Sequence, residues 1–150
     1  IDQKADMVIA SACGFPKDMN LYQTSKTIFN AVEALKKDGV MIIVSECTES
    51  FGSCATEHIV KDFDNMLDRE KAIRANYSIG AFIGYLECEY AETFNFILVT
   101  AMNPEELKST NIKVVKTIDE ALNLAYEIKG TKDLKAYMMP FGANTLPKLK

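Results

Sequence analysis

The sequence predicts a three-layer α/β domain in which helices flank a mostly parallel, open sheet. Short apolar runs alternate along the chain with longer segments of helical periodicity. The runs are rich in valine and isoleucine, as strands buried on both faces are. Neither an internal repeat nor a low-complexity linker divides the chain, and a length of 150 residues fits a single domain. We therefore expect residues 1–150 to form one α/β unit.

The first half of the chain predicts a strand, a helix and a second strand. The strands are MVIASA at 7–12 and VMIIVS at 40–45. One face of the intervening segment carries apolar side chains at helical spacing: Leu21, Ile28, Val32 and Leu35. Asp38-Gly39 follows as a stop signal. This order predicts a parallel pair joined by a right-handed crossover.

The rest of the chain continues the alternation with less sharply marked borders. Residues 53–92 contain two or three helices. Further strands are predicted at 94–101, 113–116 and 136–140. A helix between the last two starts at Thr117, where TIDE has the pattern of a capping box closed by Glu120, and stops at Gly130.

Composition excludes several classes of partner. The net charge is −4, and the lysines are scattered among acidic residues, so we expect no nucleic-acid partner. No apolar run approaches the roughly 18–20 residues of a membrane span, and no signal-peptide pattern is present, so we expect no membrane contact and a cytoplasmic location. The four cysteines form no C-x-x-C pair, which predicts buried thiols and no metal site in this chain. The one histidine, His58, is expected on the surface of a helix.

Ligands of open parallel sheets bind beyond the carboxyl ends of the strands, where three loops gather in this chain. These loops supply the candidate cleft-lining residues Gly14, Asp18, Asn20, Glu46, Asn144 and Thr145. Asp18 or Asn20 also suits the N-cap of the first helix, whose N–H groups would offer a modest anion site. Each candidate has a structural alternative, such as a plain strand-to-helix turn, a loop cap at Glu46, or turn hydrogen bonds at Asn144 and Thr145.

The first helix carries a sharper signal. Tyr22, Gln23 and Lys26 share a face that points away from the apolar side of the helix. A phenol, an amide and an ammonium group together suit a small carboxylate with an adjacent hydroxyl. The alternative is a solvated helix face without a ligand.

Three segments resemble the nickel-dependent lactate racemase family. SACGFPKDMNLYQTSK resembles its S-x-G-G-x-P-x-D-x-N-L-Y-Q-x-x-K segment, IIVSECTESFG resembles a strand ending in A-E-C-x-E-G-x-G, and MMPFGANTLP resembles M-P-x-G-x-x-T-x-P. The resemblance covers nearly the whole chain and implies the C-terminal domain of a two-domain enzyme, with Ile1 just past the hinge.

The resemblance implies an isomerase that inverts a 2-hydroxy acid in a cleft between the domains. Its cofactor is a nickel-pincer nucleotide, which exchanges a hydride with substrate C2. The resemblance assigns the cofactor-bearing lysine and the catalytic histidines to the N-terminal domain of the same polypeptide. This chain would then hold no catalytic base and be inactive alone. Tyr22, Gln23 and Lys26 match the L-Y-Q-x-x-K residues that line the substrate side.

The sequence departs from the family pattern at several positions. Cys13 replaces a glycine, Phe15 stands where many members have tyrosine, and Phe82-Ile83 replaces a histidine-lysine pair. The substrate could therefore differ from lactate. Two other classes remain open: a Rossmann-like nucleotide-binding domain, although SACGFP lacks the G-x-G-x-x-G run, and a non-catalytic interaction domain.

Overall fold

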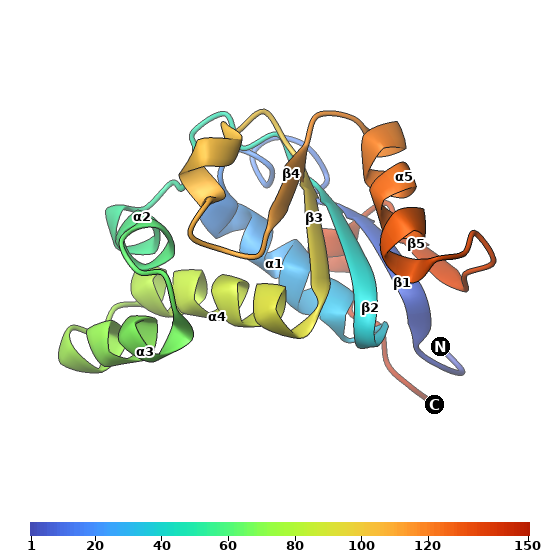
Figure 1. The fold of residues 1–150 in the computed structure, drawn as a ribbon, viewed down its shortest axis with the longest axis horizontal. Coiled ribbons are helices and arrows are strands. Elements are labelled where there is room, and N and C mark those ends of the chain that lie inside the picture. Colours follow the sequence, from blue (N-terminus) through green and yellow to red (C-terminus); the bar gives the residue numbers. More distant parts are fainter.

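The structure, a computed structural model, describes all 150 residues and confirms the predicted α/β class. Its sheet has five strands in the order β4-β3-β2-β1-β5, and every neighbouring pair is parallel (Figure 1). The strands are β1 (Ala5–Ser11), β2 (Leu35–Val44), β3 (Asn95–Val99), β4 (Lys113–Val115) and β5 (Ala136–Met139).

Helices cover both faces of the sheet and complete the three layers (Figure 1). They are α1 (Leu21–Val32), α2 (Cys54–Lys61), α3 (Met66–Ala75), α4 (Ile79–Thr93) and α5 (Ile118–Lys129), with short 3-10 helices η1 (Pro104–Leu107) and η2 (Gly142–Asn144). Helices α1 and α4 lie on one face, α2 and α3 pack against α4, and α5 lies on the other face. The segment 53–92 thus contains three helices.

The apolar runs form strands because both faces of the central sheet are buried. In β2, Met41 and Ile43 pack into the larger core beneath α1 and α4. Val40 and Ile42, which alternate with them, pack beneath α5. Side chains of a strand alternate between faces, so a strand covered twice is apolar at every position.

Right-handed connections account for the placement of α5. The chain moves from β1 to β4 in one direction across the sheet and then returns to place β5 beside β1. A right-handed crossover in the reverse direction puts its helix on the opposite face. Because α5 packs on β2, β3 and β4, the β5 edge of that face is less covered, and Met138 is 75% exposed.

The prediction that Leu35 belongs to the first helix is wrong. Helix α1 ends at Val32, and Leu35 is the first residue of β2. Leu35 is nevertheless buried in the same apolar cluster as the helix face, which explains why it matched the helical pattern. Asp38, with φ of 59°, and Gly39 lie inside β2, where the register with β1 shifts, and do not stop a helix.

The expected ends of the last helix are confirmed, with one difference in the cap. The Glu120 N–H donates to Thr117 Oγ1 (3.2 Å), and Gly130 has a left-handed φ of 67°. The Glu120 carboxylate, however, accepts from the Lys116 N–H (2.9 Å), one residue before the N-cap. The Glu120 side chain therefore bonds to the backbone of Lys116 and does not make the second hydrogen bond of a capping box, which would come from the Thr117 N–H.

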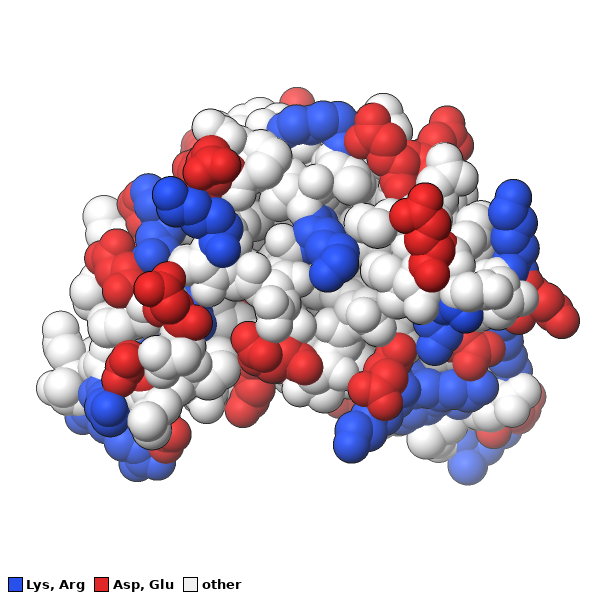
Figure 2. All heavy atoms as spheres, in the orientation of Figure 1, with Lys and Arg blue, Asp and Glu red and all other residues white.

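Two surface properties accompany this fold. Basic and acidic side chains are interspersed over the face shown in Figure 2, in keeping with a net charge of −4. None of the helices combines the length and apolar character that crossing a lipid bilayer requires.

The expectation of buried thiols holds for only half of the cysteines. Cys47 and Cys88 are buried, and burial raises the pKa of both thiols, that of Cys88 to about 12. Cys54 is exposed because it begins α2 on its solvent side, and Cys13 lies half-buried in the loop after β1. The prediction was wrong for these two residues.

Candidate functional site

A polar pocket of about 540 Å³ opens at the carboxyl ends of β1, β2 and β3, where the fold predicts a ligand site. We call it the carboxyl-edge pocket. Three expected residues line it: Gly14, Asp18 and Glu46. Glu46 is anchored by its backbone carbonyl, which accepts from Thr100 Oγ1 and the Ala101 N–H (both 2.9 Å), and its side chain is exposed.

Lys116 also lines this pocket, although no pattern in the sequence points to it. Its ammonium group donates to the carbonyls of Thr100, Ala101 and Met102, the shortest distance being 2.6 Å to Met102. The lysine thereby holds the turn after β3. The pocket thus combines two carboxylates with one cation that is already hydrogen-bonded within the protein.

The turn after β1 has the backbone of a glycine pair. Cys13 and Gly14 both have left-handed φ angles, of 77° and 74°. Side chains disfavour this conformation, whereas glycine adopts it freely. The Cys13 N–H donates to Ser11 Oγ (3.1 Å), which helps to fix the turn. The departure from the family pattern at Cys13 therefore falls where the backbone favours glycine.

The expected anion site at the start of α1 is wrong, because the protein itself satisfies those N–H groups. The Leu21 N–H donates to the Ser50 carbonyl (2.9 Å) and the Tyr22 N–H to the Phe51 carbonyl (3.2 Å). The next two N–H groups, of Gln23 and Thr24, donate to Asn20 Oδ1 (2.9 Å) and to the Asn20 carbonyl (3.1 Å). The loop after β2 thus covers the helix end.

Asn20 has a structural task in this arrangement. It is only 6% exposed, and its side-chain oxygen caps α1 while its Nδ2 donates to Glu49 Oε2 (3.3 Å). It also packs directly against Gly52, and a Cβ atom added at Gly52 would overlap the side-chain amide of Asn20. Asn20 therefore joins two loops and does not line the carboxyl-edge pocket.

We expect Asn20→Ala to lower the free energy of unfolding by about 1–2 kcal/mol, because it removes a helix cap and a buried hydrogen bond. Chemical denaturation of the purified chain would measure the change. Asn123→Ala, on the exposed side of α5, is the matched control and should change stability by less than about 0.5 kcal/mol. Equal stabilities for both variants would contradict the structural role of Asn20.

Tyr22, Gln23 and Lys26, the α1 polar trio, lie on the outward side of α1, whereas Leu21, Ile28 and Val32 are buried. Lys26 is exposed, and its ammonium donates to Gln23 Oε1 (2.8 Å). The placement agrees with the sequence analysis. None of the three lines the carboxyl-edge pocket, so the structure divides the expected residues between two places.

The closing loop packs against α1 through hydrogen bonds. Asn144 Oδ1 accepts from Lys17 Nζ (2.6 Å), and Thr145 Oγ1 donates to the Phe141 carbonyl (2.8 Å). Asn30 Nδ2 donates to the Gly142 carbonyl (2.8 Å). The Asn144 side chain therefore links the loop after β1 with the loop after β5, whereas Thr145 makes the local turn hydrogen bond that the sequence analysis considered.

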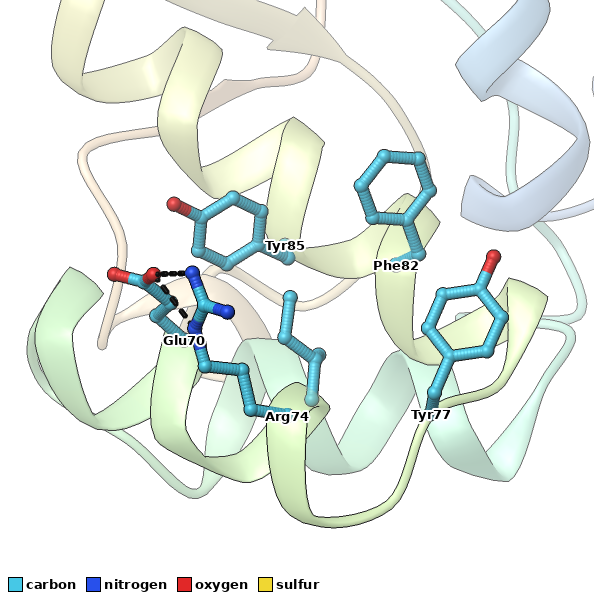
Figure 3. Close-up of a pocket in the computed structure, with 6 residues that line it drawn as sticks. Glu70, Arg74, Tyr77, Phe82 and Tyr85 are labelled. Carbon is cyan, nitrogen blue, oxygen red and sulfur yellow. Dashed lines mark hydrogen bonds and ion pairs between the residues drawn. The ribbon is translucent and has the colours of Figure 1, made fainter.

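A second pocket lies between α3 and α4 (Figure 3). This α3–α4 pocket has a volume of about 570 Å³ and is lined by Glu70, Ile73, Arg74, Tyr77, Phe82 and Tyr85. The sequence analysis singled out only Phe82, as a departure from the family pattern. The other residues belong to α3, to α4 and to the short loop between them, which carries Tyr77. The sequence marks the borders of these helices poorly, so their convergence is not predictable from it.

Neither the histidine nor any side-chain cluster forms a metal site. His58 is exposed and lies 2.7 Å from Asp62, one helical turn later, which confirms its expected surface position. The structure contains no group of three or more His, Cys, Asp and Glu side chains that could hold a metal ion.

The five-stranded parallel sheet with helices on both faces defines a three-layer α/β domain. More specifically, the chain belongs to the lactate racemase C-terminal domain family, whose model matches residues 1–146. The chain is 28% identical to the lactate racemase of Thermoanaerobacterium thermosaccharolyticum, over 97% of this chain and 35% of the relative. It is 25% identical to the lactate racemase of Lactiplantibacillus plantarum, over 95% of this chain and 35% of the relative.

A solved structure shows the same fold. The lactate racemase apoprotein of T. thermosaccharolyticum superimposes with a TM-score of 0.86 at 26% identity, covering 98% of this chain and 36% of that chain. The chain thus spans about a third of the length of the relatives it matches.

Proposed function

We propose that this chain forms the substrate-facing, C-terminal domain of a nickel-pincer-dependent racemase or epimerase of 2-hydroxy acids. One observation carries the proposal. The α1 polar trio, in a member of the lactate racemase C-terminal domain family, lies on the side of α1 that faces away from the domain's own core. A face built in this way is available to a substrate held by a second domain.

Each residue of the trio has a distinct task in this proposal. The Lys26 ammonium pairs with the substrate carboxylate, as a compact cation on a flexible stem does. The Gln23 amide and the Tyr22 phenol can each donate and accept hydrogen bonds, so they orient the hydroxyl at C2. The hydrogen bond between Lys26 and Gln23 holds two of the groups together before the acid arrives.

The residues of this chain do not fit the metal part of the cofactor. Because no cluster of His, Cys, Asp and Glu suitable for a metal ion is present, we assign the nickel-pincer nucleotide to an N-terminal domain of the same polypeptide. When bound there, the cofactor supplies reversible hydride transfer at substrate C2. This chain binds and orients the acid, and we expect it to be inactive alone. Its cytoplasmic location stays a prediction.

The proposal is tested with the full-length protein, produced together with nickel and the enzymes that build the cofactor. Single enantiomers of 2-hydroxy acids and sugar acids are incubated with the protein, and optical rotation is followed. We expect rotation to decay for at least one acid. Stable rotation for every acid, with a cofactor-loaded protein, would overturn the proposed function.

In the same assay, Lys26→Ala should lower kcat/KM by about 30-fold, which corresponds to about 2 kcal/mol for a lost charge-assisted contact. Lys108→Ala is the matched control, since this lysine is 74% exposed on the surface after η1 and should have no effect. An unchanged kcat/KM for Lys26→Ala would remove Lys26 from the site.

A further inference from the structure

We infer that the α3–α4 pocket receives the C2 substituent of the substrate and that this substituent is aromatic. The enzyme would then act on a 3-aryl-2-hydroxypropanoate in preference to lactate or a sugar acid. The inference rests on the proposed function, because it takes the α1 polar trio as the carboxylate site. It adds a substrate class and a second group of binding residues.

The pocket has the size and lining of a small-molecule site. Its volume of about 570 Å³ lies within the usual range of ligand pockets, about 300–1,000 Å³. Tyr77, Phe82 and Tyr85 present three rings, and Figure 3 shows the rings of Tyr77 and Phe82 lying side by side. Their centroids are 6.2 Å apart at an interplanar angle of 44°. Rings at such spacings favour a further aromatic group over an aliphatic one.

Helix packing brings α4, which carries Phe82 and Tyr85 of the pocket, next to α1, which carries the polar trio. Helices α1 and α4 lie on the same face of the sheet, and each is followed directly by one of the parallel strands. The two helices therefore run in the same direction (Figure 1). Phe29 of α1 packs edge-on against Tyr90 of α4, with centroids 5.8 Å apart. Tyr22 and Ile83 each lie seven residues earlier, and positions seven apart share a helix side. Tyr22 therefore lies on the same side of α1 as Phe29, and Ile83 lies on the same side of α4 as Tyr90.

The loop after β2 supports the same proximity. The Tyr22 N–H donates to the Phe51 carbonyl, and two residues later Ser53 packs on Gly80, near the start of α4. Thr56 Oγ1 also donates to the Gly80 carbonyl (2.9 Å). The beginnings of α1 and α4 are thus joined through one short segment. Phe82 lies next to Ile83 on the outer side of α4, because Ala81 and Gly84 face the core.

Most polar side chains of the pocket already have hydrogen-bond partners within the protein. Arg74 is held by Glu70, with Nη2 2.6 Å and Nε 2.9 Å from the same carboxylate oxygen (Figure 3). Ile73 and Phe82 are apolar, and Tyr77 and Tyr85 each add a ring with one hydroxyl, of which that of Tyr85 donates to Glu89 Oε1 (3.5 Å). A sugar acid would lose water from its hydroxyl groups against the rings of Tyr77 and Phe82, whereas an aryl group would bury apolar surface there.

The test compares 3-phenyllactate, lactate and glycerate as substrates of the cofactor-loaded, full-length protein. We expect kcat/KM for 3-phenyllactate to exceed both others by at least about tenfold, since hydrophobic pockets discriminate by about 10- to 200-fold per group. Unreactive 3-phenylpropanoate should also inhibit at least about tenfold more strongly than propanoate, which reports binding alone. Equal inhibition, or a preference for lactate or glycerate, would overturn the inference and leave the proposed function standing. Turnover of none of the three acids would overturn the inference, and the wider panel of the optical-rotation assay would then decide the proposed function.

A variant pair locates the aryl site. Phe82→Ala should lower the ratio of kcat/KM for 3-phenyllactate to that for lactate by at least about tenfold. Leu67→Ala, on α3 outside the pocket and 62% exposed, should leave the ratio unchanged. Circular dichroism confirms that both variants fold. An unchanged ratio in Phe82→Ala would remove the α3–α4 pocket from substrate recognition.

Discussion

Replacing Arg69 with alanine should lower the free energy of unfolding by about 3–5 kcal/mol, the largest effect that we expect from a single substitution in this chain. Arg69 is 1% exposed, which is unusual for an arginine. Chemical denaturation of the chain measures the loss. Arg74→Ala is the control, since the Arg74 side chain is 76% exposed and its ion pair with Glu70 adds little.

The expected loss follows from the contacts of the Arg69 guanidinium group. Its Nε donates to the Ile59 carbonyl (3.1 Å), and one Nη donates to the carbonyls of Val60 (3.2 Å) and Ser109 (2.6 Å). The first two carbonyls belong to the last turn of α2, where a helix dipole favours a positive charge. Arg69→Lys should retain only part of the stability, because an ammonium group lacks the planar fork. A loss below about 1 kcal/mol for the alanine variant would contradict this account.

The second large effect concerns Glu87, which is fully buried on α4 without a hydrogen-bond partner for either carboxyl oxygen. Burial raises the pKa of this carboxyl well above its ordinary value of 4.5. We expect Glu87→Met, an apolar side chain of similar length, to raise the free energy of unfolding by about 1–3 kcal/mol, because it removes two unsatisfied polar atoms. Chemical denaturation at neutral pH tests this gain.

Glu87 also predicts how stability depends on pH. Between 4.5 and the raised pKa, the folded chain keeps a proton that the unfolded chain has released. Stability is therefore highest below pH 4.5 as far as this group is concerned, and it falls as pH rises, by up to about 1.4 kcal/mol per pH unit. Glu87→Gln keeps the shape and cannot titrate, so the difference between wild type and this variant isolates the carboxyl. Parallel pH profiles would show that Glu87 is ionised in the folded chain.

The parts of the fold that the sequence predicts are those governed by local patterns. Apolar runs gave all five strands, and the cap at Thr117 with the glycine at Gly130 gave the last helix. Leu35 was misassigned because it is buried in the same core as the helix face, although the chain has already turned. Periodicity reports which side chains are buried and not where the backbone changes direction.

The parts that were not predicted depend on contacts between distant segments. The anion site at α1 failed because Ser50 and Phe51, some thirty residues later, occupy its N–H groups. The outward face of the α1 polar trio was predictable, since one helix determines it. The α3–α4 pocket and the burial of Arg69 were not, because the first depends on how α3 packs on α4 and the second on how α3 packs on α2 and Ser109.

The strand order has a consequence for how the chain reaches its native state. Strand β1 obtains its second neighbour only from β5, whose residues lie about 130 positions later. On a ribosome, the α1 layer and the first four strands can gather early, but one flank of β1 stays bare until residues 136–139 have been made. We therefore expect nascent chains halted before residue 136 to be protease-sensitive and prone to self-association, whereas a chain that includes β5 resists cleavage.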